Sequence, residues 1–235
     1  MTAPPGAPDH GIAPLRVSVE GVNGVGKTTA ARSAAAMLGP RCLLLDELTD
    51  EPGDTLPGRV IGAMAAGKDP FLRGGHPVAE TLALLALQVR KAERLAGRDL
   101  PGVDVIVEDR GIDTVAVYQA VILCSRYPGE PPESVAAHIL SAAQRWQPLP
   151  DATILLAGDH CACARRFASR TGRPLAPADV QTMERIGGLY RTMAACDPRR
   201  YVVIDVVGKT QDESASAVRD IVAALLEERE DARAS

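Results

Sequence analysis

The sequence predicts an α/β fold in which a parallel β-sheet is covered by helices on both faces. Short runs rich in leucine and β-branched residues alternate with longer segments whose apolar residues recur at helical spacing, which is typical of such sheets. The first run leads straight into a glycine-rich turn, as expected where a strand is followed by a helix. The expected strands are 15–20, 41–46, 103–108, 151–156 and 201–206, with helices between them.

Length and composition indicate one domain. The chain has 235 residues, of which 46% are hydrophobic, so it can bury a single sizeable core. We expect that domain to span residues 15–229. Residues 1–14 are rich in proline, alanine and glycine and predict a flexible tail, and residues 230–235 predict a short charged tail.

Composition also excludes several partners and compartments. A net charge of −4 provides no basic field for polymeric nucleic acid, so the expected partner is a small molecule. No apolar run is long enough to span a membrane, and the N-terminal residues lack the features of a signal peptide. The five cysteines form neither a paired framework nor a zinc spacing, which favours free thiols in a reducing cytoplasm.

The first strand runs into the pattern G-x-x-x-x-G-K-T over residues 21–28. Glycines permit a tight turn whose backbone N–H groups point at phosphate oxygens, and the following helix adds the positive end of its dipole. The pattern predicts a site for the phosphates of a nucleotide, with Lys27 on the β- and γ-phosphates and the Thr28 hydroxyl on Mg²⁺. The residues expected to contact this nucleotide are Asn23, Gly24, Val25, Gly26, Lys27, Thr28 and Thr29.

A long helix is expected over 77–97. Its apolar residues Leu82, Leu85 and Val89 recur at helical spacing and predict a buried face. Gln88 and Arg90 are polar residues of the same helix that we place on its buried or cleft-facing side, where a bound ligand is one candidate partner and a solvated surface is the alternative.

The third strand, 103–108, is followed by Asp109 and Arg110. Ligands of parallel sheets gather at the carboxyl ends of the strands, so a carboxylate here is placed to bind Mg²⁺. The planar guanidinium of Arg110 suits bidentate contact with a second phosphate.

Residues 159–178 predict a small mobile lid that closes basic groups over phosphates. A helix carries several arginines at neighbouring turns and breaks at Gly172. Asp159 and Asp179 are the acids near enough in sequence to pair with them. The arginines are Arg165, Arg166, Arg170 and Arg173. Beyond the last strand, residues 212–230 predict one amphipathic helix.

The order of these motifs resembles the thymidylate kinase family of nucleoside monophosphate kinases. The similar segments are 20–29, 51–55, 108–110, 116–119 and 150–151. The resemblance implies a P-loop NTPase fold with three α/β/α layers, a five-stranded parallel sheet and a small lid. It also implies transfer of the γ-phosphoryl group of Mg-ATP to the 5′-phosphate of a deoxynucleotide, and a homodimer.

By that resemblance Lys27, Thr28 and Asp109 handle ATP and Mg²⁺, while Arg110 grips the acceptor phosphate. Glu51, in a matching Glu-Pro-Gly turn, would help to order the acceptor side.

The lid is similar to the bacterial type, in which lid arginines reach the transferring group. Val25 agrees with this, because it leaves no arginine inside the glycine loop. Arg170 is the first candidate for that catalytic role and Arg166 the second, with Arg165 and Arg173 expected to contact ATP.

Tyr118 matches a family tyrosine that packs against the sugar and disfavours a ribose hydroxyl. Its alternative role is to fill the core with a locally bonded hydroxyl.

The acceptor side departs from the family pattern at several positions, three of which are expected to contact the base. Leu84 and Gln88 stand where the family has an aromatic residue and an arginine that contact the base, and Val115 replaces a polar base contact. A glutamine offers one donor and one acceptor in place of an arginine fork, so these changes predict retuning toward another or a modified nucleotide.

Two alternatives remain open at this point. A deoxynucleoside kinase would use Glu47 or Glu51 as the base on a 5′-hydroxyl. A nucleotide-dependent regulator would bind ATP or GTP without phosphoryl transfer, although the sequence contains no N-K-x-D guanine-binding motif.

Overall fold

The computed structural model describes residues 13–50, 52–53 and 55–234. Within them, five parallel strands form one sheet in the order β2-β3-β1-β4-β5, which confirms the expected fold class. Each strand lies within two residues of its predicted bounds. The strands are β1 (Leu15–Glu20), β2 (Cys42–Leu45), β3 (Val105–Asp109), β4 (Ala152–Ala157) and β5 (Tyr201–Asp205).

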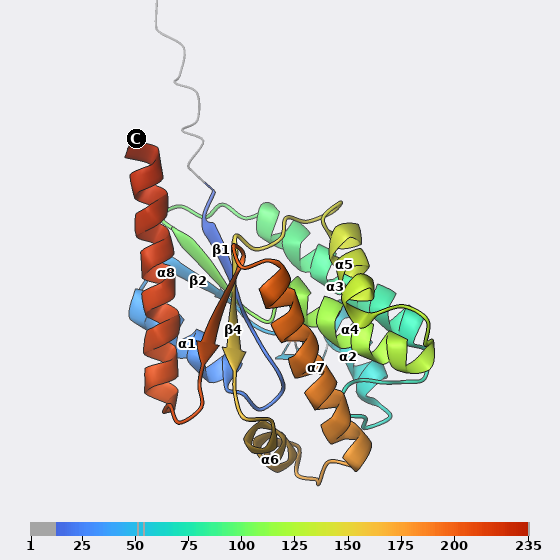
Figure 1. The fold of residues 1–235 in the computed structure, drawn as a ribbon. Coiled ribbons are helices and arrows are strands. Elements are labelled where there is room, and N and C mark those ends of the chain that lie inside the picture. Colours follow the sequence, from blue (N-terminus) through green and yellow to red (C-terminus); the bar gives the residue numbers. More distant parts are fainter. Residues whose placement is uncertain (1–12, 51, 54, 235) are drawn as a thin grey trace, which may run out of the picture.

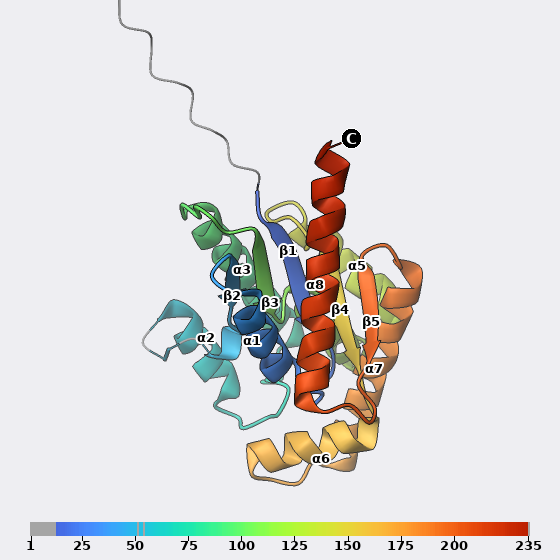
Figure 2. The same cartoon turned by 90° about the vertical axis from the view of Figure 1, so that its left-hand side faces the viewer.

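Helices cover the sheet on both faces. Helices α1 and α8 pack together on one face, and α3, α4, α5 and α7 cover the other (Figure 1; Figure 2). Helix α6 lies beyond the carboxyl ends of the strands (Figure 1). The helices are α1 (Lys27–Leu38), α2 (Leu56–Ala65), α3 (Pro77–Ala96), α4 (Ile112–Arg126), α5 (Pro132–Ala143), α6 (His160–Thr171), α7 (Pro177–Cys196) and α8 (Gln211–Ala234), with a 3₁₀ turn η1 at Leu48–Asp50.

The strand order places the predicted site in one spot. Strand β1 lies between β3 and β4, and Val19 of β1 is level with Asp109 of β3. The glycine loop that leaves β1 and the Asp109–Arg110 pair that ends β3 therefore meet at the same edge of the sheet. That edge, where the chain crosses to opposite sides of β1, is the usual ligand position in such folds.

Two sequence predictions about helices are corrected. On α3, Leu82 is 62% exposed, whereas Leu84, Leu85 and Gln88 are buried. The expected burial is confirmed for Leu85, and Val89 is half-buried, but Leu82 is exposed because it lies outside the stripe of α3 that Leu84, Leu85 and Gln88 form. Helix α8 continues to Ala234, so residues 230–234 extend a helix instead of forming a separate tail.

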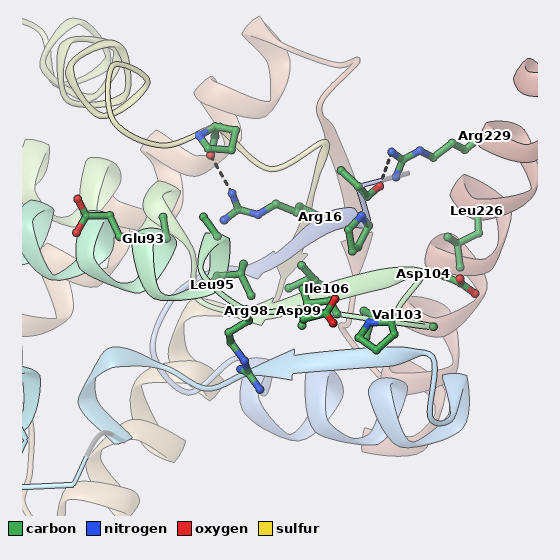
Figure 3. A pocket seen from close by; sticks show the side chains of 18 of the residues that line it. Arg16, Glu93, Leu95, Arg98, Asp99, Val103, Asp104, Ile106, Leu226 and Arg229 are labelled. Atoms are coloured by element: carbon green, nitrogen blue, oxygen red, sulfur yellow. Dashed lines mark hydrogen bonds between the residues drawn. The ribbon is translucent and has the colours of Figure 1, made fainter. Parts of the chain in front are cut away.

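A cavity of about 930 Å³ lies at the opposite end of the sheet from the glycine loop (Figure 3). Arg16 of β1 projects across it and donates to the Pro148 carbonyl, and Arg229 of α8 donates to the Ala13 carbonyl. None of the predicted site residues lines it. In the part of the chain that the structure describes, no helix is long and apolar enough to cross a membrane.

Candidate active site

The glycine loop between β1 and α1 has the backbone geometry that its sequence predicts. Gly21, Gly24 and Gly26 all have positive φ, which side chains rarely tolerate. A Cβ on Gly24 would stand 2.2 Å from the carbonyl oxygen of Cys163, so the loop can pass beneath α6 only with glycine at this position.

Lys27 is buried at the first turn of α1. Its Nζ donates a 2.7 Å hydrogen bond to the Val22 carbonyl oxygen inside the loop. Burial and the nearby Arg110 guanidinium lower the pKa of Lys27 well below its ordinary value, although Glu47 and Asp109 oppose that shift. The Lys27 amine is thus held within the glycine loop, where a bound anion would favour its charged form.

Asp109 ends β3 as a buried carboxylate. Within the described residues, neither of its oxygens has a hydrogen-bond partner of good geometry. Burial raises the pKa of Asp109, and the Thr28 hydroxyl at the start of α1 partly offsets this. A buried, unpartnered carboxylate is costly unless a cation joins it. The described residues contain no group of three or more His, Cys, Asp or Glu side chains that could hold a metal ion.

Arg110 occupies a strained backbone position between the loop and the acceptor side. Its φ of 62° is in the left-handed region, and its side chain is only 6% exposed. The Nη2 atom donates to Oδ1 of Asn23, and Nε lies 2.9 Å from Oε2 of Glu47. The guanidinium stands 5.5 Å from the centre of the Tyr118 ring. Burial would raise the pKa of Glu47, but Arg110 and Lys27 hold it below its ordinary value.

A cavity of about 190 Å³ adjoins Arg110. We call it the acceptor cavity, after the role that the sequence predicts for the residues that line it. Gln88 donates through Nε2 to the Gly111 carbonyl at 3.3 Å, and the Tyr118 hydroxyl donates to the Gly21 carbonyl at 3.4 Å. Six of the predicted site residues besides the loop line this cavity: Leu84, Gln88, Arg110, Val115, Tyr118 and Arg170. Arg90 instead lines a separate groove beside β2.

The lid arginines divide into two groups. Arg170 lines the acceptor cavity and stacks on the Phe167 ring at 5.3 Å, and its charge acts on Glu47. All four arginines are exposed, but Arg165, Arg166 and Arg173 do not line that cavity.

The two acids near the lid have other partners. Asp159 caps α6 by accepting from the Ala162 N–H at 2.7 Å, and Asp179 pairs with Arg73 at 2.5 Å. Among the described residues, the four lid arginines therefore have no carboxylate partner. Glu51 lies outside the described residues.

Sequence reasoning missed several residues of the site. Phe71 and Phe167 pack with tilted rings whose centres lie 6.0 Å apart, and both residues line the acceptor cavity. They are the only two phenylalanines of the chain, so the composition alone could have drawn attention to both. Glu47 was considered only as a base, whereas the structure pairs it with Arg110.

The fold and the site together define a P-loop phosphotransferase, with a phosphate loop on one side of Arg110 and a small acceptor cavity on the other. The family model for thymidylate kinase matches residues 19–216. The chain therefore belongs to the thymidylate kinase family.

Individual relatives agree with this assignment. A thymidylate kinase of Cereibacter sphaeroides (strain ATCC 17029) is 32% identical over 212 residues, covering 86% of this chain and 91% of the relative. A thymidylate kinase of Halorhodospira halophila is 32% identical over 219 residues, covering 89% and 94%. These relatives favour a nucleotide kinase over the nucleoside kinase and the regulator.

Solved structures support the fold. Thymidylate kinase from Candida albicans superposes with a TM-score of 0.64 at 18% identity, covering 90% of this chain and 92% of that one. Thymidylate kinase from Ehrlichia chaffeensis gives 0.62 at 17% identity, with coverage of 90% and 99%.

Proposed function

We propose that this chain transfers the γ-phosphoryl group of ATP to the 5′-phosphate of a deoxynucleoside monophosphate. One observation carries the proposal: Lys27, Asp109 and Arg110 are buried together between the glycine loop and the acceptor cavity. Phosphoryl transfer needs positioning and charge neutralisation more than covalent help, and this cluster is built for both.

On the donor side, residues 23–29 would hold the ATP phosphates through the loop N–H groups and Lys27. Thr28 and Asp109 would hold Mg²⁺, and the two buried Asp109 oxygens without partners support that assignment. When bound, this ion neutralises charge on the phosphates.

On the acceptor side, Arg110 would grip the acceptor phosphate while Asn23 and Glu47 keep its fork oriented. Arg170, already in the cavity wall, would neutralise the transferring group, with Arg166 as the second catalytic cation. Arg165 and Arg173 would contact ATP after a movement of the lid. Glu51 would order the acceptor side.

The acceptor base would lie against Leu84, Gln88 and Val115. The relatives are named thymidylate kinases, which makes dTMP the first acceptor to test. The Gln88 amide donates one N–H to the Gly111 carbonyl, so its carbonyl oxygen and its second N–H remain for a base edge that offers a donor or an acceptor. We therefore propose a base preference that extends beyond thymine, and a deoxyribose set by Tyr118.

The test is ADP release from ATP with each common deoxynucleoside and ribonucleoside monophosphate as acceptor. We expect Lys27→Ala to lose at least about 100-fold in turnover with its fold intact by circular dichroism. Lys209→Ala, an exposed lysine after β5, is the matched control. Wild-type turnover of dTMP and of no other acceptor defeats the extended preference. Turnover of no monophosphate, or full activity of Lys27→Ala, defeats the proposed function.

We also propose a homodimer that forms through α3. Val78 and Leu82 leave an apolar strip of that helix exposed, at 52% and 62%. We propose the cytoplasm as the compartment, and the five free cysteines support it.

A further inference from the structure

Glu20, the last residue of β1, is a carboxylate with no exposed surface. It accepts three hydrogen bonds from two helices on one face of the sheet. Oε1 accepts from the Gly111 N–H at 2.7 Å, and Oε2 accepts from the Thr114 hydroxyl at 2.5 Å and from the Tyr190 hydroxyl at 2.9 Å. A residue of the donor-side strand is therefore bonded to the start of α4 and to α7.

The bond to Gly111 bears directly on Arg110. Arg110 is held in the left-handed region, which a residue with a side chain adopts only when its surroundings impose it. The Glu20 carboxylate fixes the peptide that follows Arg110, and Glu47 fixes its guanidinium. A Cβ at Gly111 would stand 2.9 Å from an oxygen of Glu108 but 3.5 Å from Oε1 of Glu20, so glycine here makes room for the Glu108 side chain.

The second carboxylate oxygen of Glu20 is bonded to residues in and behind the wall of the acceptor cavity. Thr114, one of its donors, lines the acceptor cavity. Tyr190, the other donor, meets the Tyr118 ring edge-on with centres 6.4 Å apart, and Tyr118 also lines that cavity. Glu20 itself does not line the cavity, so its effect on an acceptor must pass through these neighbours.

We propose that Glu20 is a positioning residue for the acceptor, which sets the backbone of Arg110 and the hydroxyl of Thr114 from the donor-side strand. The proposal rests on the proposed function, because it concerns the same acceptor site. It differs from a purely structural role in predicting an effect on one substrate and not on the other.

The experiment measures KM for the monophosphate acceptor and KM for ATP separately. In Glu20→Ala three buried donors lose their acceptor, and we expect KM for the acceptor to rise about tenfold while KM for ATP changes less than about twofold. In Glu20→Gln the amide oxygen can still accept from the Gly111 N–H, so KM for the acceptor should return to within about threefold of the wild type.

The control is Ser214→Ala. Ser214 is also buried, but its hydroxyl donates to the Thr210 carbonyl oxygen at the start of α8, which packs with α1 on the other face of the sheet. This variant should lose stability with no separate effect on either KM. If Glu20→Ala does not fold, Tyr190→Phe carries the test, because it removes one donor without touching the cavity; we expect a rise of about two- to threefold in KM for the acceptor alone.

The proposal is overturned if KM for the acceptor stays unchanged in folded Glu20→Ala, or in Tyr190→Phe where that variant replaces it. It is also overturned if both KM values rise together. Failure of the proposed function is a different result, namely absence of turnover in the wild type.

Discussion

Four ionisable side chains lie near the glycine loop and the acceptor cavity with at most 6% of their surface exposed. They are Glu20, Lys27, Asp109 and Arg110. Two are acidic and two basic. Arg110, Asp109 and Glu20 all act on the pKa of Lys27, and Arg110 and Lys27 act on that of Asp109. Charges buried this deeply are costly to a fold unless they are paired, and clusters of this kind mark functional sites. At the residue scale, the charges of these four side chains therefore partly compensate one another, and a bound polyanion would alter that compensation.

The shifted pKa of Glu20 predicts how the free energy of unfolding depends on pH. Burial and the nearby Asp113 raise the pKa of Glu20 from 4.5 to about 7. The folded state therefore binds the proton more tightly than the unfolded state, and the stability that this contributes is complete below about pH 4.5 and is lost as pH rises through about 7. The titratable groups that act on Glu20 or that it acts on are Lys27, Asp113, Tyr118, Tyr190 and Tyr201.

We expect the free energy of unfolding of the wild type to fall relative to that of Glu20→Gln between about pH 5 and 7.5, by at most on the order of 3 kcal/mol. Urea unfolding at a series of pH values measures the difference. Parallel pH profiles for the two proteins would contradict the assigned shift.

At the scale of elements, the loop before α3 contacts both helices that flank the lid turn. Arg73 of that loop lies 2.5 Å from Asp179 in the first turn of α7 and also pairs with Asp69. Phe71 of the same loop packs against Phe167 of α6. The loop thus connects the acceptor cavity to both helices that flank the lid turn.

Breaking this connection should loosen the lid. We expect Arg73→Ala to speed limited trypsin cleavage after Arg166 or Arg170 about fivefold, because the half-buried ion pair with Asp179 no longer restrains the lid. Asp179→Asn should act in the same direction, and the double variant should add little. Arg219→Ala, which removes an exposed pair on α8, is the control; equal cleavage rates in all four variants and the wild type would refute the connection.

The strands and the glycine loop could be predicted because their signals are local. Alternating apolar residues and the spacing of Gly21, Gly24 and Gly26 depend only on neighbours in the chain. The inward face of α3 was misjudged at Leu82, because the rotation of a helix about its axis depends on what packs against it. The sequence placed the four lid arginines together, but only the structure separates Arg170 from the others.

At the scale of the whole molecule, the exposed strip on α3 predicts the oligomeric state. We expect Leu82→Glu to convert a dimer into monomers in sedimentation velocity, because a charge in an apolar interface must be desolvated. Val207→Glu is the matched control, since that residue is 61% exposed at a site far from α3 along the chain. A monomeric wild type, or a dimer that persists in Leu82→Glu, would contradict the proposed homodimer.

The sequence by itself determined the α/β fold class, the phosphate loop and the Asp109–Arg110 pair, since each is encoded by residues within one turn or one strand end. The tertiary structure alone decided which side chains share the acceptor cavity and what holds Arg110 in place. Glu20 and Tyr190 are 170 positions apart, and Arg73 and Asp179 are 106 apart. Contacts over such separations depend on the packing of whole layers, which no local pattern in the chain specifies.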